Sequence, residues 1–310
     1  MVDLNSTLGG CKYFDEDQFG KMNQGFYKRN SRQLSLLCFN VNSLPKGRDE
    51  FELFQETLKF KFDILGFTET HLNGVSEKLA TLGDYNLAAS SRIKKRGGGV
   101  AVYLRPDLTY KRRTDVDVFD EGVFESVFVE VNVGSKSYIV GVIYRPPDSD
   151  MAQFLFHLGT TLDKIKDRRS YLMGDFNIDL IKSEHHSDTG KFLDDINSVG
   201  FHPLISLPTR ITSNSATLID NIFTNDVFRP VSSGVIFSSI SDHLPNFALI
   251  GETEASSSGR PMFTLKRDMG LKNKGEFRKW VANWGKNFAP NRDSVVEDVN
   301  EFRNELRDGF

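Results

Sequence analysis

Asp175 and Asn177 are a carboxylate and a carboxamide that stand two positions apart, directly after the short apolar run at residues 171–174. Side chains two positions apart on an extended chain share one face, so both would emerge together at the end of a buried strand. Gly174 would allow another backbone to approach closely at that point. Taken alone, the same pattern is typical of a strand that runs into an Asx turn. A functional site therefore requires further polar groups at the ends of other predicted strands.

Such polar groups do occur at the ends of the other predicted strands. They are carboxylates, carboxamides, one phenol and one imidazole, namely Asn40, Asn42, Glu69, Tyr144, Asp175, Asn177, Asp220, Asp242 and His243. Each has an ordinary interpretation as a turn, a helix cap or a surface residue. Together, oxygen ligands without cysteine favour a hard cation such as Mg²⁺. Phosphate-ester chemistry would follow, because a metal ion can polarise phosphoryl oxygens while a carboxylate orients or deprotonates water.

Two polar segments stand out between the predicted strands. A basic loop carries Arg92, Lys94, Lys95 and Arg96 and is closed by glycines at 97–99. This loop is either a solvated hairpin tip or an arm that contacts phosphate groups. The second segment, at 206–216, is rich in Ser, Thr and Asn and predicts a loop or hairpin tip.

Hydrophobic periodicity predicts an α/β domain that would position these residues. A strand at 33–39, a helix at 48–58 and a strand at 63–68 form a βαβ unit, which is typical of a partly parallel sheet. Further helices are predicted at 151–165 and 192–199, where apolar residues keep the helical period. The remaining predicted strands alternate with these helices or pair as hairpins.

Three regions are predicted along the chain. Residues 1–32 show no helical or strand period and are expected to be a poorly ordered leader. The α/β domain is expected to span 33–252. A Ser- and Gly-rich stretch at 255–259 then precedes a charged segment, so residues 253–310 are expected to form a linker and a partly helical C-terminal segment.

The composition indicates a large globular domain without a strong electrostatic bias. The chain has 310 residues, of which 39% are hydrophobic and 12% aromatic, which is ample for a sizeable core. Its formal net charge of -3 provides no general attraction to nucleic acid, so any such binding would depend on local basic patches. Cys11 and Cys38 alone argue against a disulfide scaffold or a zinc cluster and suit a reducing compartment. No apolar run approaches 18 residues, so we expect a soluble intracellular protein without membrane attachment.

The order of the polar motifs resembles that of the endonuclease/exonuclease/phosphatase superfamily. The motifs that carry this resemblance are Asn40-Val41-Asn42, Thr68-Glu69-Thr70, Ile143-Tyr144, Gly174-Asp175-Phe176-Asn177, Leu218-Ile219-Asp220 and Ser241-Asp242-His243. More narrowly, the segment 209–220 resembles the apurinic-endonuclease-like domain of non-LTR, LINE-type retrotransposons of the jockey and chicken-repeat kind. The resemblance covers residues 33–252, and it implies a DNase-like four-layer α/β sandwich of two mixed β-sheets flanked by helices.

The resemblance implies a metal site built around Glu69. Glu69 would bind Mg²⁺, for which Mn²⁺ could substitute, with the help of Asn40 or Asn42 and of Asp242. Cellular repair enzymes of the superfamily carry an aspartate at the position of Asn42. The missing carboxylate argues against a second tightly held metal ion. It also argues against a housekeeping repair enzyme.

The resemblance also implies catalytic roles for five residues. Asp175 would position or activate the attacking water, and Asn177 would contact the phosphate. Tyr144 would contact the scissile phosphate. His243, oriented by Asp220, would stabilise the charge on the pentavalent phosphorus.

By the same resemblance, the expected function is Mg²⁺-dependent nicking of DNA that leaves a 3′-hydroxyl for a reverse transcriptase to extend. DNA contacts are expected from Arg92, Lys94, Lys95, Arg96, Arg145, Arg210 and Thr212. We expect a monomer that acts on DNA in the nucleus, with a reverse transcriptase domain or the element RNA as further candidate partners.

Two alternatives remain open at the level of sequence. A protein of the same fold could be a phosphatase or phosphodiesterase that acts on a small phosphate ester, because a fold does not determine its substrate. The non-enzymatic alternative is a catalytically inactive retroelement remnant that only binds. Such a remnant should have lost some of the polar strand-end residues that this chain retains.

Overall fold

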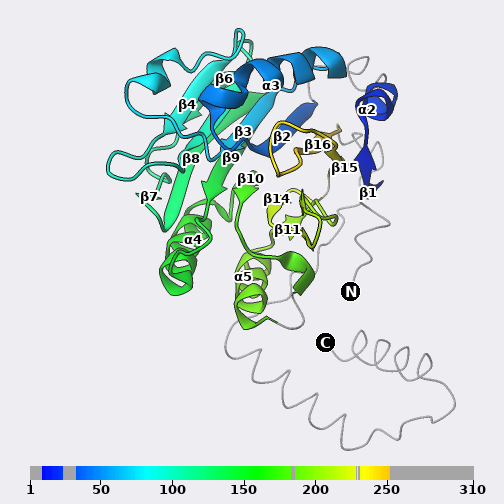
Figure 1. The fold of residues 1–310 in the computed structure, drawn as a ribbon. Helices are drawn as coiled ribbons and strands as arrows, with labels where there is room; N and C mark the ends of the chain where they lie inside the picture. Colours follow the sequence, from blue (N-terminus) through cyan, green and yellow to red (C-terminus); the bar gives the residue numbers. More distant parts are fainter. Residues whose placement is uncertain (1–8, 24–32, 183–185, 228, 230, 252–310) are drawn as a thin grey trace, which may run out of the picture. The chain divides into compact units, whose positions relative to one another are not determined.

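Two large mixed sheets pack face to face in this protein, with helices on their outer surfaces (Figure 1). The computed structural model describes residues 9–23, 33–182, 186–227, 229 and 231–251. The arrangement confirms the predicted four-layer α/β sandwich. No helix in the described residues is long and apolar enough to cross a membrane. The predicted linker and C-terminal segment at 253–310 lie outside the described residues.

The first sheet contains seven strands in the order β1-β15-β16-β2-β3-β5-β4. Their bounds are β1 (Gly9–Phe14), β15 (Val231–Ile236), β16 (Asn246–Ile250), β2 (Leu34–Asn40), β3 (Ile64–Thr68), β5 (Val100–Leu104) and β4 (Asn86–Ser90). β2 is parallel to β3, whereas β16 is antiparallel to β2. Helices α2 (Glu16–Asn23) and α3 (Leu44–Leu58) bury aromatic and aliphatic side chains on the outer face of this sheet.

The second sheet has the strand order β11-β14-β10-β9-β8-β6, and β7 pairs with β8. Their bounds are β11 (His202–Pro203), β14 (Asp220–Thr224), β10 (Ser170–Asp175), β9 (Lys136–Tyr144), β8 (Phe124–Val133), β6 (Thr109–Arg112) and β7 (Phe119–Asp120). Helices α4 (Met151–Ile165) and α5 (Ser187–Ser198) cover its outer face. The remaining elements are the two-stranded hairpin β12 (Arg210–Ile211) and β13 (Ala216–Thr217) and the short 3₁₀ helices η1 (Ser76–Leu79) and η2 (Leu180–Lys182).

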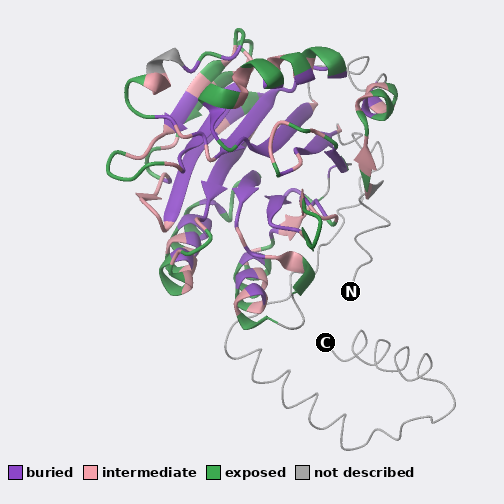
Figure 2. Ribbon diagram, in the orientation of Figure 1, coloured by how far each residue is buried: buried purple, intermediate pink, exposed green. Residues whose placement is uncertain are grey.

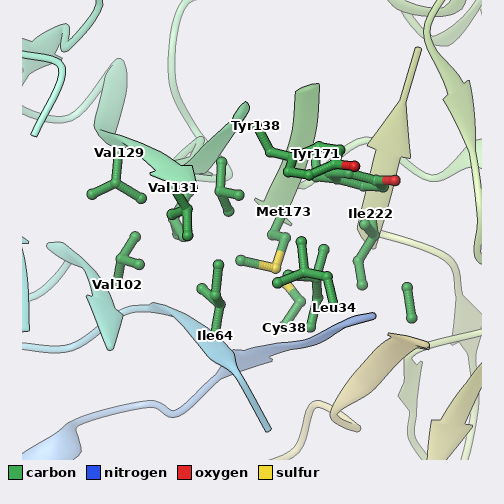
Figure 3. Close-up of a cluster of buried hydrophobic side chains, with 14 of the residues drawn as sticks. Leu34, Cys38, Ile64, Val102, Val129, Val131, Tyr138, Tyr171, Met173 and Ile222 are labelled. Carbon is green, nitrogen blue, oxygen red and sulfur yellow. The ribbon is translucent and has the colours of Figure 1, made fainter. Parts of the chain in front are cut away.

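Aliphatic side chains fill most of the space between the two sheets. Figure 3 shows Val129 and Met173 of the second sheet facing Ile64 and Cys38 of the first sheet. In Figure 2 the strands of both sheets are largely buried, and the exposed residues lie on the outward sides of the helices and in loops. This core locks the two sheets together, so the ends of their strands occupy fixed positions relative to each other.

Helix α3 begins four residues earlier than the sequence predicts. The sequence pattern indicates a turn at 42–45 before a helix at 48–58, but the helix starts at Leu44. Pro45 lies in the first turn, where its missing N–H costs no helical hydrogen bond. The helix ends at Leu58, and the C-cap residue Lys59 adopts a left-handed conformation with φ of 50°.

The expectation of a poorly ordered leader at 1–32 is wrong for residues 9–23. β1 pairs in parallel with β15, and α2 buries Phe19 completely against Phe60, Phe62 and Phe247. The segment shows no clear period because β1 is an edge strand and because Phe19 is the one large apolar residue that α2 buries completely. Contacts with distant residues therefore order a segment whose hydrophobic pattern does not predict a strand or a helix.

Candidate active site

The strand directions bring one end of each central strand to the same edge of the sandwich. β2 runs parallel to β3 and β9 runs parallel to β10, so all four C-terminal ends can lie there. β14 is antiparallel to β10, so its first residue, Asp220, pairs with the last residue of β10, Asp175. β16 is antiparallel to β2, so the loop before it, which contains His243, also reaches this edge. Residues from six segments of the chain therefore meet at one place.

Asn40 joins the two sheets at this edge. Its amide nitrogen donates to Glu69 Oε1 and to Asp175 Oδ2, both at 2.8 Å. Ionised carboxylate oxygens only accept hydrogen bonds, so this orientation of the amide satisfies both partners. Asn40 Oδ1 accepts instead from the Asn42 N–H at 3.1 Å. Asn40 therefore acts here as a donor that holds two carboxylates together, whereas we expected it to offer oxygen to a metal ion.

Glu69 presents a negative charge that solvent can reach. Its second oxygen, Oε2, lies 3.5 Å from His71 Nε2, and 25% of its side chain is exposed. Burial would raise its pKa, but hydrogen bonds from His71 and Asn40 and the charge of His243 lower the pKa to about 2. An ionised and partly exposed carboxylate of this kind suits a hard divalent cation.

Asp175 lies completely buried at the end of β10. Burial and the charge of Asp220 raise its pKa, against the opposing effects of His243 and of hydrogen bonds from Asn40 and the Asn177 N–H. The Asn177 N–H donates to Asp175 Oδ1 at 2.9 Å. A carboxylate whose pKa is raised is a better proton acceptor at neutral pH than an ordinary aspartate.

The backbone around Asp175 is fixed by close packing. A Cβ on Gly174 would lie 1.8 Å from the Ile143 carbonyl oxygen, so β9 and β10 can approach only because this residue is glycine. This confirms the close approach predicted from the sequence. Asn177 Nδ2 donates to the Arg145 carbonyl oxygen at 2.8 Å, so its amide group binds the neighbouring loop.

Asp220 and His243 form a buried pair. His243 Nδ1 lies 2.9 Å from Asp220 Oδ2. His243 is 5% exposed and Asp220 is 1% exposed. Burial would lower the pKa of His243, but the charge and the hydrogen bond of Asp220 raise the pKa to about 9. His243 is therefore protonated at neutral pH, and because Nδ1 is held by Asp220, only Nε2 remains for a substrate.

Thr209 holds this pair in place and was missed by the sequence analysis as a site residue. Thr209 Oγ1 donates to Asp220 Oδ2 at 2.7 Å and accepts from the Asp220 N–H at 3.1 Å. Its carbonyl oxygen accepts from the Leu244 N–H at 2.6 Å, one residue after His243. The one signal for Thr209 in the sequence was its place at the start of the segment 209–220, which resembles the retrotransposon domain.

Tyr144 ends β9 and is 4% exposed. Burial raises the pKa of its phenol, and the nearby charges of Glu69 and Asp175 raise it further. The hydroxyl therefore stays protonated and can donate. Tyr144 therefore places a hydroxyl group beside Glu69 and Asp175, and its contact to a phosphate group stays a prediction.

Five residues near this edge have backbone φ angles in the positive range. Their φ values are 41° for Asn42, 92° for Ser43, 50° for Glu69, 53° for His71 and 48° for Asn177. Such conformations are uncommon for residues other than glycine and tend to gather at functional sites. Backbone hydrogen bonds hold this geometry, for example from the His71 N–H to the Gly98 carbonyl oxygen at 2.8 Å.

Asp242 and Arg210, predicted to contact a metal ion and DNA, are paired with each other. Nε and Nη2 of Arg210 donate to Asp242 Oδ2 at 2.9 and 2.7 Å. Arg210 also forms an isolated β-bridge with His243, so the base of the hairpin lies against the loop that contains His243. Both side chains are about two-fifths exposed, so the pair lies at the surface and each charge neutralises the other.

Arg145 and Arg92 do not fit the surface DNA contacts that we expected. Arg145 is 6% exposed and donates to the carbonyl oxygens of Asn177 and Ser149 at 3.1 and 3.0 Å. Arg92 is bound to the carboxylate of Glu125, which is completely buried. Both guanidinium groups therefore anchor loops from within: Arg145 through Nη1 and Nη2 to backbone carbonyl oxygens, and Arg92 through a buried carboxylate.

Lys94, Lys95 and Arg96 are exposed, as a phosphate-contacting arm requires. The loop that carries them is braced by Glu121, whose carboxylate accepts the N–H groups of Ile93, Lys94 and Lys95 at 2.7, 3.1 and 3.2 Å. The basic loop is therefore held in one conformation before any ligand binds.

Thr212 lies at the exposed tip of the hairpin that follows Arg210. Its hydroxyl oxygen accepts from the N–H groups of Asn214 and Ser215 at 3.3 and 3.1 Å. The Thr212 hydroxyl therefore shapes the turn of the hairpin, which projects beside the Asp220–His243 pair.

A divalent cation fits best at Glu69. Asp175, Asp220 and His243 also offer one ligand atom each within 4.8 Å of one another. However, His243 Nδ1 is already bonded to Asp220, and its ring is protonated at neutral pH, whereas a metal ligand must be deprotonated. The ionised carboxylate of Glu69 needs no proton release and is open to solvent.

Comparisons with known proteins agree with this fold. Residues 37–243 match the model of the Endonuclease/Exonuclease/phosphatase family, which is more than half of the chain. No curated protein sequence matches the chain.

Solved structures of similar fold include two endonucleases and a third protein. The endonuclease domain of TRAS1, a telomere-specific non-LTR retrotransposon, matches with a TM-score of 0.57 and 16% identity over 70% of this chain and 98% of that chain. An AP endonuclease from Archaeoglobus fulgidus matches with a TM-score of 0.53 and 20% identity, over 70% of this chain and 99% of that chain. Humanized D. rerio TDP2 matches with a TM-score of 0.53 and 15% identity, over 72% of this chain and 100% of that chain. At these identities the structures establish the fold, and together with the family match they show that the chain belongs to the endonuclease/exonuclease/phosphatase family, whose members are metal-dependent phosphodiester hydrolases.

Proposed function

We propose that this domain is a Mg²⁺-dependent endonuclease that nicks DNA and leaves a 3′-hydroxyl. The observation that carries the proposal is the edge at which Asn40 holds Glu69 and Asp175 together. The buried Asp220–His243 pair lies beside Asp175 at the same edge. A proton acceptor, a cationic imidazole and an ionised carboxylate thus converge where the strands end.

The residues of the chain suit in-line hydrolysis of a phosphodiester. Asp175 accepts a proton from a water molecule as its oxygen forms a bond to phosphorus. The bond between phosphorus and O3′ breaks, and O3′ takes up a proton and leaves as the 3′-hydroxyl, while the other product carries a 5′-phosphate. A divalent ion at Glu69 would polarise the phosphoryl oxygens and stabilise the leaving oxygen.

His243 and Tyr144 would bind the charge that develops on the phosphate. The imidazolium of His243 can donate from Nε2 to a non-bridging oxygen, and Asp220 keeps the ring protonated and oriented. The protonated hydroxyl of Tyr144 is a second donor. Both groups are held before the substrate arrives, so little reorganisation is needed during the reaction.

The substrate assignment rests on surface features near the site. The exposed Lys94, Lys95 and Arg96 can bind phosphate groups of a duplex, and the hairpin at 209–217 can enter a groove. The fold shared with the endonuclease domain of TRAS1 supports DNA as the substrate and extension of the nick by a reverse transcriptase. A reverse transcriptase domain and the element RNA are the further partners that this assignment implies.

Incubation of the purified chain with supercoiled plasmid and Mg²⁺ tests the proposal. The expected result is conversion to open circles whose nicks a DNA polymerase extends without prior phosphatase treatment, because the 3′ end is a hydroxyl. EDTA should abolish nicking, and added Mg²⁺ or Mn²⁺ should restore it.

A matched Glu69→Gln variant is the control for contaminating nuclease, since it keeps the size of the side chain and removes its charge. Full nicking by this variant in Mg²⁺ would overturn the site assignment. Hydrolysis of a small phosphate ester or of a terminal 3′-phosphate, without nicking, would favour the phosphatase alternative. DNA binding without either reaction would favour an inactive remnant.

A further inference from the structure

β1 contacts the entrance to the hairpin at 209–217, which comprises β12, β13 and their turn. Tyr13 Oη donates to the Pro208 carbonyl oxygen at 3.0 Å, across 195 positions of sequence. The Tyr13 ring also stacks on Phe237, with ring centroids 5.3 Å apart and an interplanar angle of 15°. Tyr13 is therefore fixed by stacking on Phe237, and its hydroxyl group binds Pro208, the residue directly before the hairpin.

Cys11 makes a second contact from the same face of β1. It lies two positions before Tyr13, and Ser206 and Leu207 lie beside its sulfur, where they oppose the rise in the pKa of the thiol that burial causes. Cys11 and Tyr13 both pack against a small apolar cluster formed by Ile205, Leu218 and Val235. Because Leu218 directly follows the hairpin, β1 contacts both its entrance and its exit.

β1 is itself tightly bound to the first sheet. It pairs in parallel with β15, and its end is fixed by a hydrogen bond from the Phe237 N–H to the Phe14 carbonyl oxygen at 2.9 Å. A Cβ on Gly234 of β15 would lie 2.6 Å from the Lys12 carbonyl oxygen and 2.5 Å from the Phe14 ring. The glycine therefore permits the close approach through which β1 reaches the hairpin.

The hairpin transmits its position directly to the candidate active site. The residue after Pro208 is Thr209, which hydrogen-bonds Asp220, and the next is Arg210, which pairs with Asp242. A shift at Pro208 would therefore move the projecting tip relative to the reacting groups.

We propose that β1 is a brace for the DNA-reading hairpin, and that Tyr13 is a positioning residue that sets where along a duplex the domain nicks. This inference rests on the proposed function. It assigns a role in substrate selection to a segment that precedes the first residue of the family match. Tyr13 acts through the hairpin and touches no reacting group.

The test compares the full chain with its Tyr13→Phe variant, which keeps the ring and its stacking but removes the hydrogen bond to Pro208. Tyr103→Phe is the matched control, because Tyr103 Oη also donates to a backbone oxygen, that of Ala80, at 2.7 Å in a buried part of the first sheet. Gly234→Ala is a second variant that displaces β1 as a whole. Two measurements are made: amide hydrogen exchange over residues 205–218 without DNA, and a map of nick positions on one long duplex with kcat and KM.

Tyr13→Phe should exchange the hairpin amides about two- to tenfold faster, the range expected when one hydrogen bond is removed. Its nicks should spread to positions that the unmodified chain leaves intact, with a change in KM larger than the change in kcat. Gly234→Ala should show both effects, and Tyr103→Phe neither. Unchanged exchange in Tyr13→Phe, or faster exchange with an unchanged nick map, would overturn the inference.

Failure of the proposed function would be recognised separately. In that case the unmodified chain nicks no DNA in Mg²⁺ or Mn²⁺, whereas the exchange measurement still reports whether Tyr13 holds the hairpin. Exchange that does not depend on Tyr13 overturns the brace even if the unmodified chain is an active nuclease.

Discussion

Asn40 stands between two carboxylates that would otherwise repel each other. Its single amide nitrogen donates to Glu69 and Asp175, one from each sheet. The two acids nevertheless differ in chemistry, because Glu69 has a pKa of about 2 while burial and Asp220 raise the pKa of Asp175. One neutral residue thus keeps an anion and a proton acceptor at a fixed separation.

Replacement of Asn40 by alanine should therefore impair both carboxylates at once. A hydrogen bond to a charged partner contributes about 1.5–3 kcal/mol, so we expect the nicking rate to fall about ten- to hundredfold or more. The Mg²⁺ concentration for half-maximal rate should rise as well. Titration of nicking with Mg²⁺ checks this, and Asn86→Ala, at the exposed carboxamide that begins β4, is the control. An unaltered Mg²⁺ requirement in Asn40→Ala would contradict the bridging role.

The Asp220–His243 pair should behave as one unit in catalysis. Asp220→Ala removes the partner of His243 Nδ1, and His243→Ala removes the imidazolium itself. Each single variant should lose most of the activity, and the double variant should lose little more. Single-turnover rates of the three variants test this. Losses that add strictly in the logarithm of the rate would indicate separate roles.

The same pair predicts a pH dependence of folding stability. The pKa of His243 is about 9 in the folded state against an ordinary value of 6.5, so the imidazolium stabilises the fold. This contribution, on the order of 3 kcal/mol, is fully present below pH 6.5 and is lost as the pH rises through about 9. Urea unfolding of the unmodified chain and of His243→Gln in EDTA at about pH 6, 8 and 10 should show a difference in free energy that shrinks with pH. A constant difference would exclude a raised pKa.

Among the elements, the basic loop and the hairpin should make different contributions to DNA recognition. Replacement of Lys94, Lys95 and Arg96 by alanine should weaken binding to all sequences and reduce the salt slope by roughly one unit for each phosphate group that is no longer neutralised. Lys164, Lys166 and Arg168, near the start of β10 at the opposite edge, offer a control with the same change of charge. The test is the affinity of both triple variants for DNA, measured at several salt concentrations. An equal loss of affinity in both variants would exclude a local effect of the basic loop.

Exchange of hairpin residues 211–216 should instead move the preferred nick positions while cleavage of DNA in general continues. Thr209, Arg210 and Thr217 are retained because Thr209 contacts Asp220, Arg210 pairs with Asp242, and Thr217 closes the hairpin. A groove-reading loop can respond to groove width and deformability, which phosphate contacts do not sense. Nick maps of the exchanged and unmodified chains test this. Identical maps would show that the hairpin does not select the site.

The sequence was most informative where a strand ends in a polar residue. Apolar runs before Glu69 and Asp175 predicted both the strands and the edge where they meet, since period and polarity are local properties. Asp220 instead begins its strand and reaches the same edge because β14 is antiparallel to β10. It was misleading for Arg145 and Arg92, because an arginine in a loop looks the same whether its guanidinium faces solvent or binds buried carbonyl and carboxylate oxygens.

Other features depend on contacts between distant segments and left little trace in the pattern. β1 gains its order from a parallel pairing with β15, which lies near the other end of the domain, and from Phe19 packing on Phe247. Thr209 gains its importance only when the hairpin folds against Asp220. Neither pairing can be read from residues near in sequence, so both required the structure.

At the scale of the whole molecule, the site draws on nearly the full length of the domain. Asn40 comes from its first central strand, and His243 precedes its last. Their neighbours Glu69, Tyr144 and Asp175 are delivered by strands in between. Every partner in the hydrogen-bond network therefore depends on sheets whose strands are remote in sequence.

This dispersion has a consequence for when the protein becomes active. A growing chain on the ribosome lacks β15, which pairs with β1, as well as His243 and β16, which pairs with β2, until the domain is almost complete, so shorter nascent chains cannot assemble the candidate active site. Folding dominated by such distant pairings is also slow, which delays activity further. The candidate active site is therefore complete only after almost the whole domain has been synthesised and folded.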